Sequence, residues 1–147
     1  MIIEELIPLK DQEEFTYAVT DGGYGEFLNI HLQRKRGELL TLMKFDQDLI
    51  GTPYPPALHG GTIAALLEIA AYCQLAWETQ MTVHPKTVDI NIDYLRSGKP
   101  LDTWARAKVF RMGRRFANLH VEAWQDNPEK PIATAHLHFL IIDPVKG

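Results

Sequence analysis

The sequence predicts an α+β fold in which a curved antiparallel sheet wraps around one long central helix. The helix is expected over residues 62–77, a stretch of mostly apolar helix formers in which Glu68 is the one formally charged residue. After this stretch the pattern changes to an alternation of apolar and polar residues, which is typical of strands. A helix that is apolar on nearly every side must be covered, and a strongly curved sheet is the partner that this chain offers.

Three elements are expected before the long helix, separated by turn-forming glycines. Alternating apolar and polar residues predict a hairpin whose two strands meet at Gly37. The expected elements are a short helix over residues 10–19, a strand that starts at Glu26, and its hairpin partner over residues 38–45. Residues 51–56 hold three prolines, which cannot donate to a sheet ladder, so an irregular passage is expected to lead into the long helix.

Four strands are expected after the long helix. Apolar residues alternate with polar ones over residues 88–94, which gives the first strand one apolar and one polar face. Turn residues at 97–100, at Gly113 and at 126–131 divide the rest of the chain. The strands bounded by these turns cover residues 101–111, 115–125 and 132–142.

Length and composition are typical of one globular domain. The 147 residues predict a single domain, 1–147, in which residues 1–22 form an N-terminal extension with a short helix. A hydrophobic content of 46% is enough for a core, and a net charge of −4 argues against nucleic acid as a partner. Cys73 is the one cysteine, so no internal disulfide is expected, and its place in the apolar helix predicts a core residue.

Neither a signal peptide nor a membrane segment is expected. The first residues carry acids and lack the basic region and long apolar run of a signal peptide. No stretch approaches the apolar length that a membrane-spanning helix needs, so no membrane partner is expected. These observations predict a soluble, cytoplasmic protein.

The acid within the apolar helix is the main candidate for chemistry. An ionised carboxylate among apolar neighbours costs free energy unless it is paired, hydrogen-bonded or partly protonated. Upstream of Glu68, the sequence His59-Gly60-Gly61 brings bare backbone N–H groups to the start of the helix, where the helix dipole favours negative charge. A buried acid below a glycine-rich helix N-terminus is suited to catalysis. Tyr72 follows Glu68 by four residues, so it is expected to hydrogen-bond the acid, to line a pocket, or to pack in the core.

No metal site is expected. His136 and His138 share one face of a strand, but no third ligand accompanies them. Asp89, Asn91 and Asp93 have the spacing of a calcium loop, yet the glycine and the terminal glutamate of such a loop are missing.

Four short motifs in a fixed order resemble one enzyme family. They are Leu58-His59-Gly60-Gly61 with an acid nine residues after the histidine, the strand 88–96 ending in Tyr-Leu-Arg, the hairpin Gly113-Arg114, and the final strand beginning Pro131-Ile132-Ala133. Over roughly residues 25–142 the chain resembles the hotdog-fold acyl-CoA thioesterases. Within them, it is most similar to the phenylacetate-degradation (PaaI-like) and 4-hydroxybenzoyl-CoA thioesterases. The resemblance implies the same wrapped fold that the periodicity predicts.

The resemblance also implies roles for individual residues. Glu68 falls on the catalytic acid, Gly60 on the backbone donor to the oxyanion with Gly61 beside it, and His59 on the histidine that shapes the start of the helix. Acyl-CoA is then the substrate, no cofactor is needed beyond this CoA, and the site lies between subunits of a homodimer or homotetramer. Some members carry an amide residue six positions before the histidine, where this chain has Pro53.

Three arginines at turns are candidates for contact with the phosphates of CoA. They are Arg96, Arg114 and Arg115, and guanidinium groups suit phosphate because they donate two parallel hydrogen bonds. Together with Tyr72 they form the predicted substrate-binding set.

The expected function is hydrolysis of a medium-chain or aromatic acyl thioester to the free acid and CoA. Glu68 is expected to act either as general base on water or as nucleophile, and the sequence leaves both routes open. A non-catalytic acyl-CoA-binding protein is the alternative, which Pro53 favours. A hotdog dehydratase or hydratase is a further alternative, but the chain lacks a matching histidine–acid motif.

Overall fold

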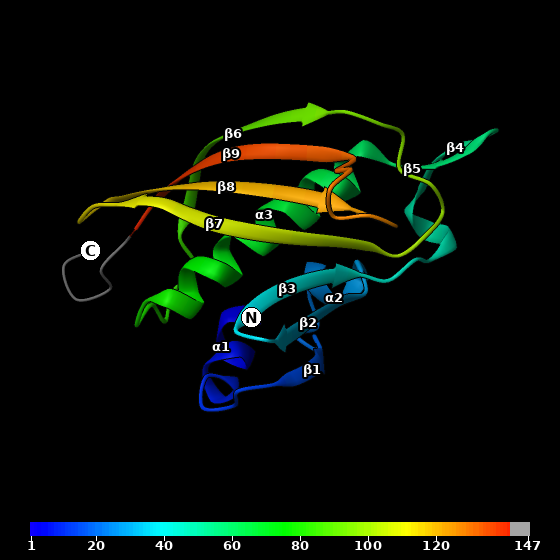
Figure 1. Cartoon of the computed structure of the whole chain (residues 1–147). Coiled ribbons are helices and arrows are strands. Elements are labelled where there is room, and N and C mark those ends of the chain that lie inside the picture. Colours follow the sequence, from blue (N-terminus) through cyan, green and yellow to red (C-terminus); the bar gives the residue numbers. More distant parts are fainter. Residues whose placement is uncertain (142–147) are drawn as a thin grey trace.

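A computed structural model describes residues 1–141 of the chain. Seven strands form one antiparallel sheet in the order β1-β2-β3-β7-β8-β9-β6, and the long helix α3 (Gly60–Glu78) lies against it (Figure 1). The strands are β1 (Phe15–Ala18), β2 (Ile30–Lys35), β3 (Glu38–Met43), β6 (Lys86–Tyr94), β7 (Thr103–Met112), β8 (Phe116–Trp124) and β9 (Ala133–Leu140). The predicted architecture of one sheet around one central helix is confirmed.

The N-terminal segment differs from the expectation of a helix over residues 10–19. The helix lies earlier, as α1 (Ile2–Leu6) followed by the 3-10 turn η1 (Ile7–Leu9), and residues 15–18 form β1 instead. In β1 the partly buried Phe15 and Tyr17 alternate with exposed neighbours, and the strand pairs with β2. The alternation of partly buried and exposed residues, together with pairing to β2, thus makes this segment a strand. The prediction of a helix over residues 10–19 is wrong.

The hairpin that follows begins later than expected. The short helix α2 (Tyr24–Phe27) occupies the start of the predicted strand, and Asn29, with φ of 59°, then turns the chain into β2. The turn between β2 and β3 lies where it is expected, because Arg36 and Gly37 both have positive φ, as a tight hairpin turn requires.

The proline-rich passage before α3 is more regular than expected. After the 3-10 turn η2 (Gln47–Leu49), β4 (Ile50–Pro53) pairs with β5 (Pro56–Leu58) in a small second sheet. Pro53 and Pro56 face each other at the turn end of this pair, where a missing N–H costs least. The expectation that the prolines forbid pairing is therefore wrong.

The strands after α3 are confirmed, with an arrangement that the sequence did not predict. β6 lies at the edge of the sheet beside β9, so the chain crosses the sheet between β6 and β7. A bulge separates Thr87 from Asp89 in the ladder with β9, and it leaves Val88 55% exposed. β9 ends at Leu140, and the expected end at residue 142 lies outside the described residues.

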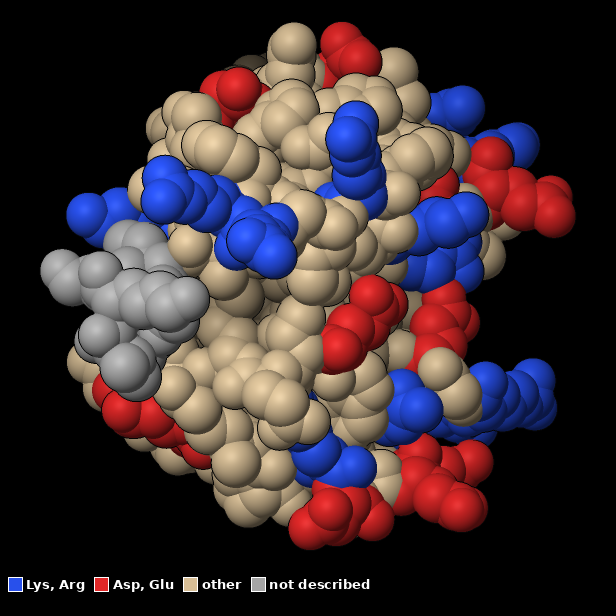
Figure 2. Space-filling view, turned by 90° about the vertical axis from the view of Figure 1, so that its left-hand side faces the viewer, with Lys and Arg blue, Asp and Glu red and all other residues tan. Residues whose placement is uncertain are grey.

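The turn of the β7–β8 hairpin and the residue Tyr94 lie at opposite ends of the strands of the sheet. Tyr94 is level with Ala133 of β9, whereas Phe116, the first residue of β8, is level with Leu140. Figure 2 looks onto the end of the molecule that carries the hairpin, where basic and acidic side chains surround a largely uncharged centre. Arg114 and Arg115 lie in the hairpin turn.

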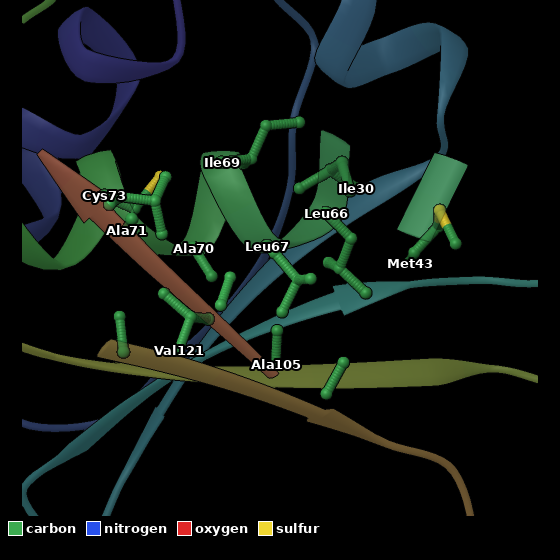
Figure 3. Close-up of a cluster of buried hydrophobic side chains, with 14 of the residues drawn as sticks. Ile30, Met43, Leu66, Leu67, Ile69, Ala70, Ala71, Cys73, Ala105 and Val121 are labelled. Atoms are coloured by element: carbon green, nitrogen blue, oxygen red, sulfur yellow. The ribbon is translucent and has the colours of Figure 1, made fainter. Parts of the chain in front are cut away.

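The core lies between α3 and the sheet. Leu67 and Ala70 point from the helix toward Ala105 and Val121 of the sheet (Figure 3). The sheet meets the helix with small, fully buried residues, which allow the two backbones to approach closely. These residues are Ala105, Ala117, Ala123, Ala133 and Ala135. Within residues 1–141, no helix combines the length and apolarity needed to cross a membrane.

Candidate active site

Along its middle, α3 is partly open on one face, although many of its other positions are buried. The buried positions include Ile63, Leu66, Leu67, Ile69, Ala70, Ala71, Cys73, Leu75 and Ala76. Other positions of the helix are open as well, and five of them follow one another along this face: Gly61, Ala64, Ala65, Glu68 and Tyr72. Because these positions recur at intervals of three or four residues, they form one stripe along the helix. The stripe joins the helix N-terminus to the predicted catalytic acid.

The helix N-terminus leaves the N–H of Gly60 available. His59 caps the helix, and its Nδ1 accepts a hydrogen bond of 2.8 Å from the N–H of Gly61. The hydroxyl of Tyr94 donates to the carbonyl oxygen of Gly60 at 2.8 Å. Among the described residues the N–H of Gly60 has no partner, so it is the free donor at this end of the helix.

The close approach of β4 to the cap requires a glycine. A Cβ on Gly51 would lie 2.6 Å from the Cα of His59, so β4 can approach the cap only through glycine. A Cβ on Gly60 would lie 3.5 Å from the ring of Tyr94, which is ordinary contact. Neither Gly51 nor Tyr94 could be assigned to the site from the sequence, because both reach the cap from other elements.

A cavity of about 450 Å³ opens beside the cap. Gly60, Tyr94 and Arg96 line it, together with the polar residues Thr52 and Ser97. The structure thus brings Gly60 and Arg96, two of the predicted site residues, to one cavity.

Glu68 lies midway along the open stripe. Its Oε2 accepts a hydrogen bond of 3.1 Å from the hydroxyl of Thr87, which the bulge in β6 turns toward the helix. Tyr72 lies one turn further on, and its ring meets the imidazole of His84 edge to face, with centroids 4.6 Å apart. Burial, and then the nearby charges of groups such as Glu68, raise the pKa of Tyr72 far above its usual value, so the phenol stays neutral.

The other two predicted arginines lie far from this cavity. Ala123, level with Tyr94, is separated from Phe116 by seven residues of β8, which corresponds to roughly 23 Å of strand. Arg114 and Arg115 come directly before Phe116, at the far end of the strand. Within one chain, the structure therefore does not bring these two arginines to Arg96.

Comparison with known proteins identifies the family of the chain. A family model described as the thioesterase superfamily matches residues 56–132, just over half of the chain. The chain belongs to the thioesterase superfamily. Its fold is the hotdog fold of that superfamily, as the resemblance implied. No curated protein matches the chain with significant similarity.

Solved structures extend the likeness over nearly the whole chain. A protein of Chromobacterium violaceum is 30% identical, with coverage of 96% of this chain and 98% of its own and a TM-score of 0.63. A phenylacetic acid degradation-related protein of Ralstonia eutropha is 20% identical, covering 92% of this chain and 98% of its own with a TM-score of 0.74. A Bacillus halodurans protein solved with CoA is 17% identical, covering 96% of this chain and 89% of its own with the same TM-score of 0.74.

The remaining polar candidates of this superfamily member lie away from the stripe. Cys73 is fully buried, and burial raises the pKa of its thiol well above the usual value, so it is an inert core residue. His138 lies on the opposite face of the sheet, where its Nδ1 is 2.6 Å from Oδ1 of Asp89. His120 and His136 stack on the same face with centroids 4.5 Å apart. Within residues 1–141, no three such side chains converge on a metal position.

Proposed function

We propose that the chain is a cytoplasmic acyl-CoA thioesterase that hydrolyses a medium-chain or aromatic acyl thioester. The observation that carries the proposal is the open stripe of α3, which joins an unpaired N–H at Gly60 to the carboxylate of Glu68. Eight residues separate the two, roughly 12 Å along the helix axis. Because side chains lean toward the helix N-terminus, the carboxylate of Glu68 lies nearer to Gly60 than its own Cα does.

Gly60 is the proposed donor to the oxyanion. Attack on the thioester carbonyl places negative charge on its oxygen, and the N–H of Gly60 lies at the positive end of the helix dipole. The N–H of Gly61 is already bonded to His59, so the role of Gly61 is to close the cap rather than to bind the substrate. Tyr94 donates to the carbonyl oxygen of Gly60, which belongs to the next peptide, Gly60–Gly61.

Glu68 has two chemical routes. As general base it takes a proton from water, the resulting hydroxide attacks the carbonyl carbon, and collapse of the tetrahedral intermediate expels CoA as thiolate. As nucleophile it attacks the carbonyl itself, expels the thiolate, and leaves a mixed anhydride that water then hydrolyses. In both routes the hydrogen bond from Thr87 holds the carboxylate in place.

A second copy of the chain completes the proposed site. β6 is an edge strand that exposes Val88 and Tyr94, and the next residue, Leu95, is exposed as well; an edge of this kind is suited to pairing. With a two-fold axis beside β6, the strands of the partner run in the opposite direction to those of this chain. The hairpin turn with Arg114 and Arg115 of the partner then lies toward the Gly60 end, where Arg96 already lines the cavity.

The phosphates of CoA are the proposed ligands of these arginines. The CoA present in the Bacillus halodurans structure supports CoA as the carrier. Neither a metal nor a cofactor has a role in this proposal, because the carboxylate and the backbone donor supply the chemistry. A homotetramer would contain two such pairs.

Thiol release from a panel of acyl-CoAs tests the proposal, with wild type beside Glu68→Gln. We expect turnover by wild type and a loss of about 10²-fold or more in kcat for the variant, with KM little changed. Glu78→Gln, an exposed acid at the end of the same helix, is the matched control and should keep full activity. Full activity of Glu68→Gln would show that the acid is wrongly assigned. Binding without turnover by wild type would favour the acyl-CoA-binding protein that Pro53 suggests.

A further inference from the structure

The loop between α3 and β6 contributes a histidine to the open stripe. Residues 79–85 fold back along the helix, and Thr79 anchors them by donating to the carbonyl oxygen of Leu75 at 2.8 Å. Pro85 is buried and restricts the backbone of His84 to extended conformations. The backbone around His84 is therefore held by the fold, and His84 is not a freely moving surface residue.

His84 meets the stripe through Tyr72. The two rings are 4.6 Å apart with an interplanar angle of 76°, an edge-to-face contact that favours one orientation of the phenol ring. Three residues after His84, Thr87 bonds to Glu68. One short segment thus supports two neighbouring residues of the stripe, the proposed catalytic acid and the tyrosine beyond it.

The direction of the substrate follows from the proposed function. If the CoA phosphates lie at the Gly60 end, the acyl group extends past Glu68 in the opposite direction along the stripe. Tyr72 and His84 are the next side chains on that path. Their orientation consequently sets the room for an acyl group that is long enough to reach them.

Resting on the proposed function, we propose that His84 is a positioning residue of the acyl-binding end. As a neutral imidazole it holds Tyr72 in the orientation that accepts the acyl group. When His84 is protonated, its charged ring leaves the apolar contact for water and Tyr72 loses its support.

The electrostatic surroundings agree with a neutral imidazole at pH 7. Burial lowers the pKa of His84 below its usual value, and the N-terminal amino group acts in the same direction. The carboxylates of Asp21, Glu4 and Glu68 act in the opposite direction. Since a bound acyl group removes further water, it favours the neutral form, and by linkage acid conditions must weaken binding.

Binding of a non-hydrolysable thioether analogue of an acyl-CoA tests the inference. Calorimetry from pH 5.5 to 8 compares the wild type with His84→Ala and His84→Phe, and thermal melts verify that each variant folds. His84→Ala should bind about two- to tenfold more weakly at pH 7.5, which is the range expected for one aromatic contact. His84→Phe should bind like wild type at pH 7.5, and it should lack the weakening that wild type shows below about pH 6.5.

Two controls make the result specific. An acetyl-CoA analogue, too short to reach Tyr72, should bind all three proteins equally. His138→Phe, on the opposite face of the sheet, should leave the affinity and its pH dependence unchanged. Equal affinity of His84→Ala and wild type, an acid weakening that persists in His84→Phe, or no binding by the wild type would each overturn the inference.

The assay separates this inference from the proposed function. It measures binding of an analogue that cannot be hydrolysed, so its outcome does not depend on turnover. A wild type that binds the analogue with the expected pH dependence, yet releases no thiol from any acyl-CoA, would contradict the thioesterase proposal and leave the role of His84 intact.

Discussion

A single tyrosine links the edge of the sheet to the start of the helix. Tyr94 ends β6, and its hydroxyl holds the carbonyl oxygen of Gly60, the residue whose N–H is the proposed oxyanion donor. The contact crosses 34 residues of sequence and restrains Gly60 through its carbonyl group, in the peptide after the one that carries the donor N–H. Tyr94 therefore acts on the chemistry through Gly60.

Tyr94→Phe should lower kcat by about fivefold while leaving KM nearly unchanged. The variant removes one hydrogen bond, a contribution of about 1 kcal/mol, and the ring still fills its place against Gly60. Steady-state thiol release measures the effect, and Tyr54→Phe, at a tyrosine that is 91% exposed, serves as the control. A rate equal to that of wild type would show that the Gly60 peptide needs no support from the sheet.

The sequence identifies the residues of the site that lie close together along the chain. Glu68 and His59 belong to one helix and its cap, so their spacing alone places them along the same structure. Thr87 and His84 could not be found this way, because their contacts depend on a bulge and on the path of a loop. Arg96 and Arg114 look equivalent as turn residues, yet the sheet holds them at opposite ends.

At the scale of elements, the close contact of α3 with the sheet depends on alanine. Ala105 of β7 is fully buried beneath the helix, whereas Ala18 of the edge strand β1 is exposed. Ala105→Leu should destabilise the protein by about 1–3 kcal/mol, because added methylenes force the helix away from the sheet. Ala18→Leu adds the same volume and should change stability little. Urea denaturation measures both, and equal midpoints for the two variants would contradict this account of the packing.

The stacked histidines on the outer face predict a loss of stability in acid. Burial, and then the proximity of His136, lower the pKa of His120 in the folded state below its unfolded value of about 6.5. The unfolded chain therefore binds more protons, and the contribution to stability falls as the pH drops through this value. His120→Asn should show a smaller decrease in urea midpoint between pH 7.5 and 5.5 than wild type does. The same decrease in both proteins would exclude His120 as a source.

Secondary structure was predictable where a hydrophobic pattern continued over many residues. It was not predictable where pairing with a strand distant in the sequence determined it. The apolar stretch of α3 and the alternation in β7, β8 and β9 lead directly to the observed elements. Residues 15–18 form a strand because β2 lies beside them, and β4 pairs with β5 despite its prolines. The position of β6 at the sheet edge also depends on a long-range pairing that no local pattern contains.

At the scale of the molecule, a site shared between two copies makes a quantitative prediction. Glu68→Gln and the double variant Arg114→Ala/Arg115→Ala each impair both sites of their own homodimer. After the two are mixed and subunits exchange, a heterodimer contains one site with an intact Glu68 and intact arginines. Activity should recover to about a quarter of wild type, since half of the dimers are mixed and half of their sites are whole.

The mixing experiment has an internal reference. Mixing the double variant with itself should give no recovery, and light scattering before and after mixing verifies that the oligomer re-forms. No gain in activity despite verified exchange would place the arginines and the acid of one site in the same chain.

The position of β9 between β8 and β6 governs the order in which the sheet can be built during synthesis. β6 leaves the ribosome well before β9, yet within residues 1–141 β9 is the one strand with which it pairs, as in the match of Lys86 with Leu140. Until the segment from Ala133 to Leu140 emerges, one side of the helix stays uncovered and an edge strand stays unpaired. A nascent chain that stalls before Ala133 is thus expected to depend on chaperones, because its most apolar helix has only part of its sheet.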